Sequence, residues 1–269
     1  MGSCNRCGAQ NRPSARFCKK CGAPIEKSVA REGYYGKECI DGELRKFQER
    51  LKLAVHLKES GTGARVGLDS LILGPQGSGK KFIAGKIISM AVAAKIINPA
   101  KVVEVDAADY ENWSENLDET LSGISDGALI VTNVHKILCG VSSSEITSLD
   151  TLFVRMTRET AKLPIIIMTG LYNDMESYLS VNAGVATLFE FKFRLSNIDE
   201  DVLASLTAAI LKERFRLDMT PDAVAKLKGH YEWMVRLGDG TSGNGHLAMS
   251  KAEELATNMF NRGGTDIIT

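Results

Sequence analysis

The feature that most restricts the possible folds of this chain is a glycine-rich loop between an apolar run and an amphipathic stretch. Residues 74–80 read GPQGSGK and match the pattern GxxxxGK. The run 68–73 before the loop is typical of a buried strand, and the stretch that begins at Lys80 has helical spacing. The glycines let backbone N–H groups surround an anion, and the helix N-terminus adds partial positive charge. The sequence therefore predicts a phosphate-binding loop.

This loop supplies the candidate contacts for the phosphates of ATP or ADP. Lys80 is expected to reach the β and γ phosphates. Lys81 stands where the motif has a Ser or Thr whose hydroxyl binds Mg²⁺, so we expect only weak dependence on Mg²⁺. The predicted nucleotide-binding residues are Gly74, Pro75, Gln76, Gly77, Ser78, Gly79, Lys80 and Lys81.

Helical and strand patterns alternate along most of the chain. Helical spacing is expected over 39–60, 80–97, 111–124 and 148–163, and strands over 68–73, 101–105, 128–131, 165–168 and 189–193. Strands separated by helices predict an α/β fold whose parallel sheet is covered on both faces. Beyond Ser196, helical patterns over 202–215, 222–237 and 247–261 predict a small helical C-terminal lid.

Two cysteine pairs dominate the N-terminal segment. Cys4 and Cys7 form one C-x-x-C-G motif, and Cys18 and Cys21 form a second one after ten intervening residues. A gap of two residues lets both thiolates of a turn bind a single ion, and four sulfurs complete a tetrahedral zinc shell with no open position. Iron accepts the same ligands, but the short spacing favours zinc. The pattern predicts a structural zinc ribbon; two unrelated thiol pairs are the alternative reading.

Charge and hydropathy limit the kinds of partner that the sequence supports. Lys plus Arg and Asp plus Glu both count 33, so the net charge gives no argument for nucleic acid as the main partner. Residues 1–31 carry seven basic side chains against Glu26, yet Phe17 is their single aromatic, which favours protein docking over nucleic-acid binding. No apolar stretch approaches the ~20 residues of a membrane span, so we expect a cytoplasmic protein without a membrane partner.

Five segments, placed in the expected order, carry a family resemblance. They are KVVEVDAAD (101–109), GALIVTNVHKI (127–137), PIIIMTGLYNDMESYL (164–179), NAGVATLF (182–189) and GNGH (243–246). Together with the loop they resemble the CbxX-type AAA+ family, which includes rubisco-activase-like chaperones and AAA+ proteins of type VII secretion. The resemblance implies a three-layer AAA+ sandwich that assembles into homo- or hetero-oligomers with a protein client or an AAA+ partner subunit.

The expected division follows from these features. Residues 1–30 form the zinc ribbon, 31–60 a linker and N-terminal helix, 61–195 the AAA+ α/β core and 196–269 the helical lid.

The departures from the resembled family fall on its catalytic positions. Thr132 and Asn133 stand where the family has an Asp that holds Mg²⁺ through water and a Glu that polarises the attacking water. Neither residue acts as a general base near neutral pH. Ala186 and Leu188 stand in place of the arginines of the arginine-finger segment, and His246 replaces the sensor-2 arginine. Thr169, at the sensor-1 position, remains able to contact the γ phosphate.

This pattern predicts a pseudo-ATPase, a regulatory or scaffold subunit that binds nucleotide while the ribbon recruits a protein. One alternative is an active AAA+ ATPase that remodels proteins. If the alignment is shifted by a residue or two, Asp126 or Glu145 would supply the carboxylates, although Asp126 precedes its strand and would lie at the wrong end. A zinc-ribbon factor that binds nucleic acid is the second alternative.

Overall fold

The apolar runs of the sequence form one parallel sheet in a computed structural model of the chain. The structure describes residues 2–3, 10–11, 37–62, 65–107, 117–138, 143–158, 163–236, 244–263 and 267–268. The chain divides into two compact units, Met1–Tyr35 and Gly36–Thr269. In the first unit, β1 (Gly2–Ser3) pairs antiparallel with β2 (Gln10–Asn11). The four cysteines of the predicted zinc site lie outside the described residues.

The five-stranded sheet of the second unit has the order β4-β5-β6-β3-β7, and every pairing in it is parallel. The three central strands are buried along their whole length, which explains why they read as continuous apolar runs. The α/β prediction is confirmed. The strands are β3 (Ser70–Leu73), β4 (Val102–Asp106), β5 (Ala128–Thr132), β6 (Ile165–Gly170) and β7 (Phe191–Arg194).

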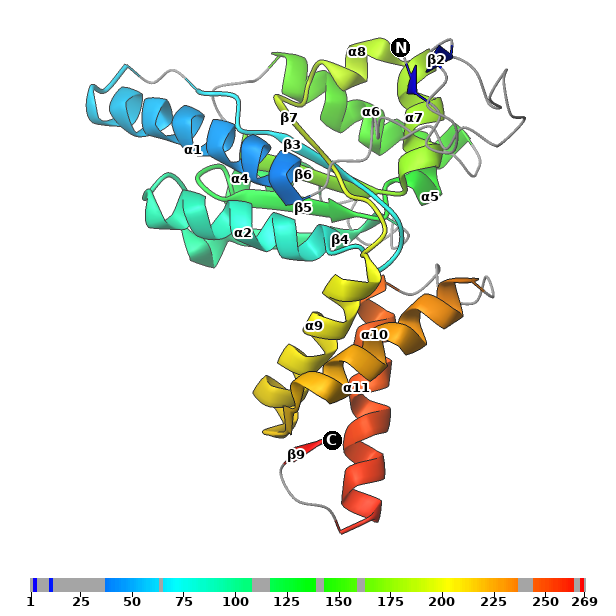
Figure 1. Ribbon diagram of the computed structural model, residues 1–269. Helices are drawn as coiled ribbons and strands as arrows, with labels where there is room; N and C mark the ends of the chain where they lie inside the picture. Colours follow the sequence, from blue (N-terminus) through cyan, green and yellow to red (C-terminus); the bar gives the residue numbers. More distant parts are fainter. Residues whose placement is uncertain are drawn as a thin grey trace. The chain divides into compact units, whose positions relative to one another are not determined.

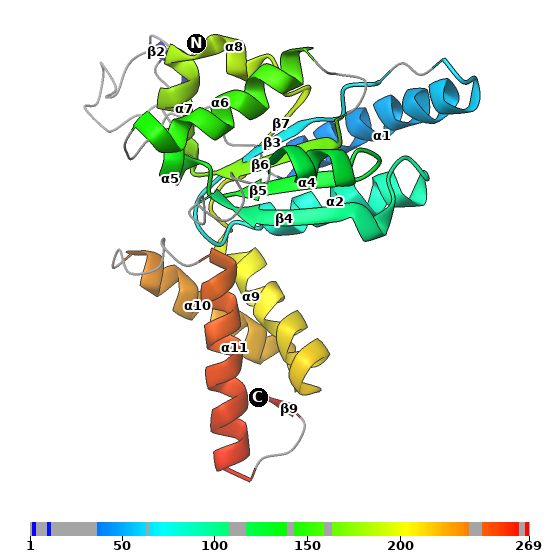
Figure 2. The ribbon, with the colours of Figure 1, turned by 180° about the vertical axis from the view of Figure 1, so that it is seen from behind.

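Helices cover both faces of this sheet (Figures 1 and 2). The buried side chains form two separate apolar layers, one on each face. One face packs against α1 (Lys37–Glu59) and α2 (Lys80–Ala93). The opposite face packs against α4 (Leu117–Gly123), α5 (His135–Leu138), α6 (Ser143–Arg158), α7 (Tyr172–Val181) and α8 (Ala183–Ala186). Because side chains alternate along a strand, successive residues of each strand belong to opposite layers.

The C-terminal part is helical, as predicted. α9 (Glu200–Ile210) continues as a π-helix (Leu211–Phe215) and packs against α10 (Pro221–Arg236) and α11 (Asn244–Asn261). Tyr231 of α10 is fully buried, and its hydroxyl lies 2.7 Å from the hydroxyl of Thr207 of α9. Two short strands, β8 (Asp218–Met219) and β9 (Ile267–Ile268), pair in parallel as a two-stranded sheet, separate from the five-stranded one.

Several predicted element ends are wrong. The helix expected over 80–97 ends at Ala93, because Lys95 adopts a left-handed conformation (φ 58°) and the backbone N–H groups of Ala94 and Lys95 bond back to the last turn. α6 begins at Ser143, before the apolar periodicity that was expected from residue 148. The short helices α5, α7 and α8 carry no strong periodic pattern and were not predicted as helices.

Candidate nucleotide site

The predicted phosphate loop connects the carboxyl end of β3 to the first turn of α2. Gly79 precedes the helix with φ 92°, a conformation that residues with a side chain rarely adopt. A Cβ atom on Gly74 would lie 2.7 Å from the Cβ of Leu195 and 2.8 Å from Ser78 Oγ, so the loop has no room for a side chain there. The N-terminus of α2, a helix of 14 residues, faces the loop and favours an anion beside it.

Lys80 is folded onto the loop. Its Nζ donates to the backbone carbonyls of Gly74 at 2.8 Å and Pro75 at 2.6 Å. Burial lowers the pKa of Lys80 from its ordinary value. The ammonium group therefore lies at the loop, where it is able to exchange these carbonyls for phosphate oxygens.

Lys81 points to a neighbouring strand. It is the second residue of α2, and its Nζ forms an ion pair with Glu104 Oε1 of β4. Where the motif places a hydroxyl for Mg²⁺, this chain therefore places an ammonium group. Two cationic side chains, Lys80 and Lys81, begin the helix that follows the loop.

The carboxyl end of β5 offers no carboxylate of its own. Thr132 is buried, and its hydroxyl donates to the carbonyl of Val105 on β4 at 3.3 Å. Asn133 follows with φ 57°, and its Nδ2 donates to Asp106 Oδ2 at 2.7 Å. Both side chains predicted to stand at the acidic positions of the resembled family are thus hydrogen bonded to neighbouring groups of the chain.

Asp106 ends β4 directly beside Thr132, its Cα partner across the two strands. It was not among the predicted site residues. A carboxylate at the carboxyl end of a parallel strand is a recognisable signal, because ligands bind at that edge of such sheets. By contrast, Asp126 precedes β5 and pairs with Lys101, just before β4, at the opposite edge. The side chain of Glu145, the other alternative, lies outside the described residues.

A histidine between the ends of β5 and β6 is a second group that the sequence analysis missed. His135 begins α5, and its Nδ1 accepts a hydrogen bond from the backbone N–H of Leu171 at 3.3 Å. Burial lowers the pKa of His135; the charge of Lys80 acts in the same direction, whereas those of Asp174 and Asp106 oppose it. His135 is therefore electrostatically coupled to the lysine of the phosphate loop.

Thr169, the predicted sensor-1 residue, is buried near the end of β6, which lies between β3 and β5. Its backbone carbonyl accepts from the N–H of Val134 at 3.0 Å and so joins the chain after β5 to β6. Strand alternation places the side chains of Thr169 and Thr132 on the sheet face that packs against α2.

The segment predicted as sensor 2 contacts the loop through residues other than His246. Asn244 is only 3% exposed, and its Nδ2 donates to the carbonyl of Gln76 at 2.9 Å. The backbone N–H of Gly245 donates to the carbonyl of Gly77 at 3.0 Å. His246 is exposed in the first turn of α11. The start of α11 is thus hydrogen bonded to two carbonyls of the phosphate loop.

The residues of the predicted finger segment have no charged group to offer. Ala186 ends α8, and Leu188 packs against the apolar layer that contains α5 to α7. The nearest arginine along the chain is Arg194, at the end of β7, whose guanidinium lies 5.0 Å from the ring centre of Tyr172.

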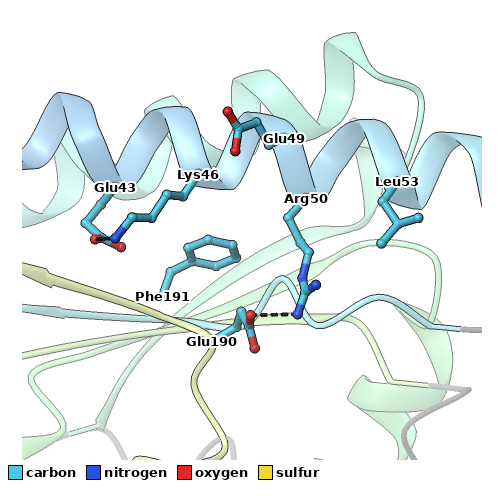
Figure 3. A pocket seen from close by; sticks show the side chains of 7 residues that line it. All are labelled: Glu43, Lys46, Glu49, Arg50, Leu53, Glu190 and Phe191. Carbon is cyan, nitrogen blue, oxygen red and sulfur yellow. Dashed lines mark hydrogen bonds and ion pairs between the residues drawn. The ribbon is translucent and has the colours of Figure 1, made fainter.

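A separate pocket of about 400 Å³ lies between α1 and the start of β7 (Figure 3). Its charges are largely paired: Arg50 binds Glu190 at 2.7 Å and Lys46 binds Glu43 at 2.6 Å. It does not include the phosphate loop. The lining residues are Glu43, Lys46, Glu49, Arg50, Leu53, Glu190 and Phe191.

The described residues contain neither a metal cluster nor a membrane-spanning helix. Within these residues, no group of three or more His, Cys, Asp or Glu side chains is arranged to hold a metal ion. None of the described helices has the length and hydropathy needed to cross a membrane.

Comparisons with known proteins give two kinds of match. The zinc-ribbon domain family matches residues 3–25, the segment that contains all four cysteines of the predicted site. The ESX-1 secretion system protein EccA1 of Mycolicibacterium smegmatis (strain ATCC 700084 / mc(2)155) is 24% identical over 149 residues, 52% of this chain. The protein of the same name from strain MKD8 matches equally.

The aligned segment spans only 26% of the length of either EccA1 relative. The two kinds of match confirm the zinc ribbon and support the resemblance to AAA+ proteins of type VII secretion. The roles of individual residues at the loop and the strand ends stay predictions.

Proposed function

We propose that this chain, which joins a zinc ribbon to an AAA+-type core, binds ATP or ADP and hydrolyses it poorly or not at all. One observation carries the proposal: the carboxyl end of β5 presents Thr132 and Asn133, both hydrogen bonded within the chain. Phosphoryl transfer depends on groups that orient metal and water, and neither side chain is a carboxylate. The loop, in contrast, keeps its glycines and Lys80.

Nucleotide affinity and phosphate release test this proposal. Lys80→Ala removes the ammonium that contacts the loop and should weaken ATP and ADP binding at least about tenfold, the loss of one charge-assisted contact. Lys86→Ala, on an exposed position of the same helix, is the matched control and should bind like the wild type. Phosphate release by the wild type should equal that of Lys80→Ala; a clear excess would contradict the proposal.

The position of the Asp106 carboxylate favours a second candidate function, that of an active ATPase. Its carboxylate lies one strand away from the family's acidic position and accepts from Asn133. If this carboxylate orients the attacking water, phosphate release must exceed the Lys80→Ala background and fall to it in Asp106→Asn. Absence of release in the wild type excludes this role.

We also propose that the chain is a regulatory or scaffold subunit in a homo- or hetero-oligomer and that its ribbon recruits a protein. The similarity to EccA1, named as a protein of the ESX-1 secretion system, supports a place beside a secretion system of that kind. Light scattering after size exclusion, with and without ATP, tests assembly. Deletion of residues 1–30 should abolish partner capture without changing nucleotide affinity; retained capture would contradict the role given to the ribbon.

A further inference from the structure

The ion pair between Lys81 and Glu104 lies beside the phosphate loop and has no role in the core. Both side chains are solvent accessible, with 73% and 45% of their surfaces exposed. Exposed ion pairs contribute little to stability, because solvent screens them and ordering two long side chains opposes them. Lys81 is therefore free to exchange Glu104 for a stronger anion.

The ion pair lies on the sheet face that packs against α2, the helix that follows the phosphate loop. Val102 belongs to the apolar layer beneath α2, whereas Val103 and Val105 belong to the opposite layer. Alternation along β4 then places Glu104 and Asp106 on the α2 side. The ammonium of Lys81 bridges α2 and β4 on the face where a phosphate-loop protein holds its metal.

The hydroxyl and the aspartate that hold Mg²⁺ in a phosphate-loop protein are missing here, and the two carboxylates on this face are already paired, Asp106 with Asn133 and Glu104 with Lys81. Mg²⁺ requires oxygen ligands in near-octahedral geometry. The hydroxyl of Thr132 is directed at the carbonyl of Val105, and Asn133 turns its amide N–H₂ toward Asp106. Lys81 adds a positive charge where the hydroxyl ligand is expected, and that charge repels a divalent cation.

We infer that the site takes the polyphosphate of ATP or ADP without a divalent cation, and that Lys81 supplies the positive charge that the metal supplies elsewhere. An ammonium group has three hydrogen atoms to donate and no demand on coordination geometry, so it suits phosphate oxygens. In the free chain Glu104 pairs with Lys81 and must release it before the ammonium binds phosphate oxygens. This inference rests on the proposed nucleotide binding and specifies the form of the ligand.

Calorimetric titration with ATP and ADP, in EDTA and in excess Mg²⁺, tests the inference on the full chain. The wild type should bind with the same affinity in both buffers, to within about twofold. Lys81→Ala should bind about tenfold more weakly in EDTA, the loss of one charge-assisted contact. Glu104→Gln should bind more tightly than the wild type, because the competing carboxylate is gone. Lys86→Ala is the control on the same helix, and thermal melting verifies that each variant is folded.

Three outcomes would overturn the inference. The first is wild-type binding that strengthens tenfold or more with Mg²⁺, above all if Asp106→Asn removes that gain, because Asp106 would then hold the metal. The second is an unchanged affinity of Lys81→Ala, and the third is a weaker affinity of Glu104→Gln. Binding that requires Mg²⁺ leaves the proposed function intact, whereas no binding of either nucleotide in any buffer removes both.

Discussion

Asn244 Nδ2 lies 2.9 Å from the carbonyl oxygen of Gln76, although 168 residues separate them along the chain. The same amide group donates to Asn197 Oδ1 at 3.1 Å, and its Oδ1 accepts from the backbone N–H of Ile198 at 2.7 Å. One buried side chain thus joins the phosphate loop, the segment between β7 and α9, and the start of α11.

Asn244→Ala should lower the free energy of unfolding by about 1–3 kcal/mol, because it leaves the buried N–H of Ile198 without an acceptor. Asn244→Asp keeps that acceptor but loses the donor to Gln76. It should therefore weaken nucleotide binding by more than its effect on folding stability explains. Urea denaturation and nucleotide titration measure the two effects. Asn173→Ala, at an exposed site of α7, is the control; equal stability of the three variants would contradict the role of Asn244.

Asp69→Ala should destabilise the chain more than Asn244→Ala does. The carboxylate Oδ1 accepts from Arg65 Nη2 and from the backbone N–H of Ile166, each at 2.8 Å. Burial raises the pKa of Asp69, whereas the charge of Arg65 opposes that rise. Removing one partner of a buried pair costs about 3–5 kcal/mol. Asp69→Asn retains an acceptor for Ile166 and should lose less; the reverse order in chemical denaturation would contradict this account.

Stability should fall on acidification through the titration of His135. Because burial lowers the pKa of this group in the folded chain, the unfolded chain binds the proton first as the pH falls through the ordinary value of 6.5. His135→Asn removes this contribution and should flatten the decline of the unfolding free energy below that pH. High salt should preserve most of the difference in unfolding free energy between the wild type and His135→Asn, because burial rather than charge is the main cause of the lowered pKa. An identical pH dependence in the variant would exclude His135.

The ribbon should hold about one zinc ion per chain, bound by four thiolates. Cys4→Ser or Cys18→Ser should reduce the zinc content of the purified protein, measured by elemental mass spectrometry. Cys39→Ser and Cys139→Ser, which replace the two cysteines outside the C-x-x-C pairs, serve as controls and should retain zinc. Loss of zinc in the controls, or retention in the first pair, would contradict the assignment.

The sequence was most informative where local pattern and tertiary position agree. Strands β3, β5 and β6 are buried on both faces, and their apolar runs therefore marked them within two residues of their observed ends. The phosphate loop was recognisable because its glycines have conformations that few other residues adopt.

The remaining parts of the site depend on contacts that no local pattern encodes. The roles of Asn244 and Gly245 come from hydrogen bonds to a loop far away in the sequence, so the segment was recognisable but its contacting residues were not. Asp106 was within reach of sequence reasoning, because it directly follows the predicted strand that ended at Val105. His135 gave no signal of its own beyond its position two residues after Asn133.

The left-handed backbone of Asn133, with φ 57°, has a consequence for any attempt to introduce the acidic pair of the resembled family. Asparagine tolerates this conformation, but most residues with a longer side chain pay roughly 1–2 kcal/mol to adopt it. A glutamate introduced there would either strain the turn or reshape it, and a shifted turn would disturb the link from Val134 to Thr169. Introducing an acidic pair at the end of this strand therefore strains or remodels the main chain, besides requiring two new side chains.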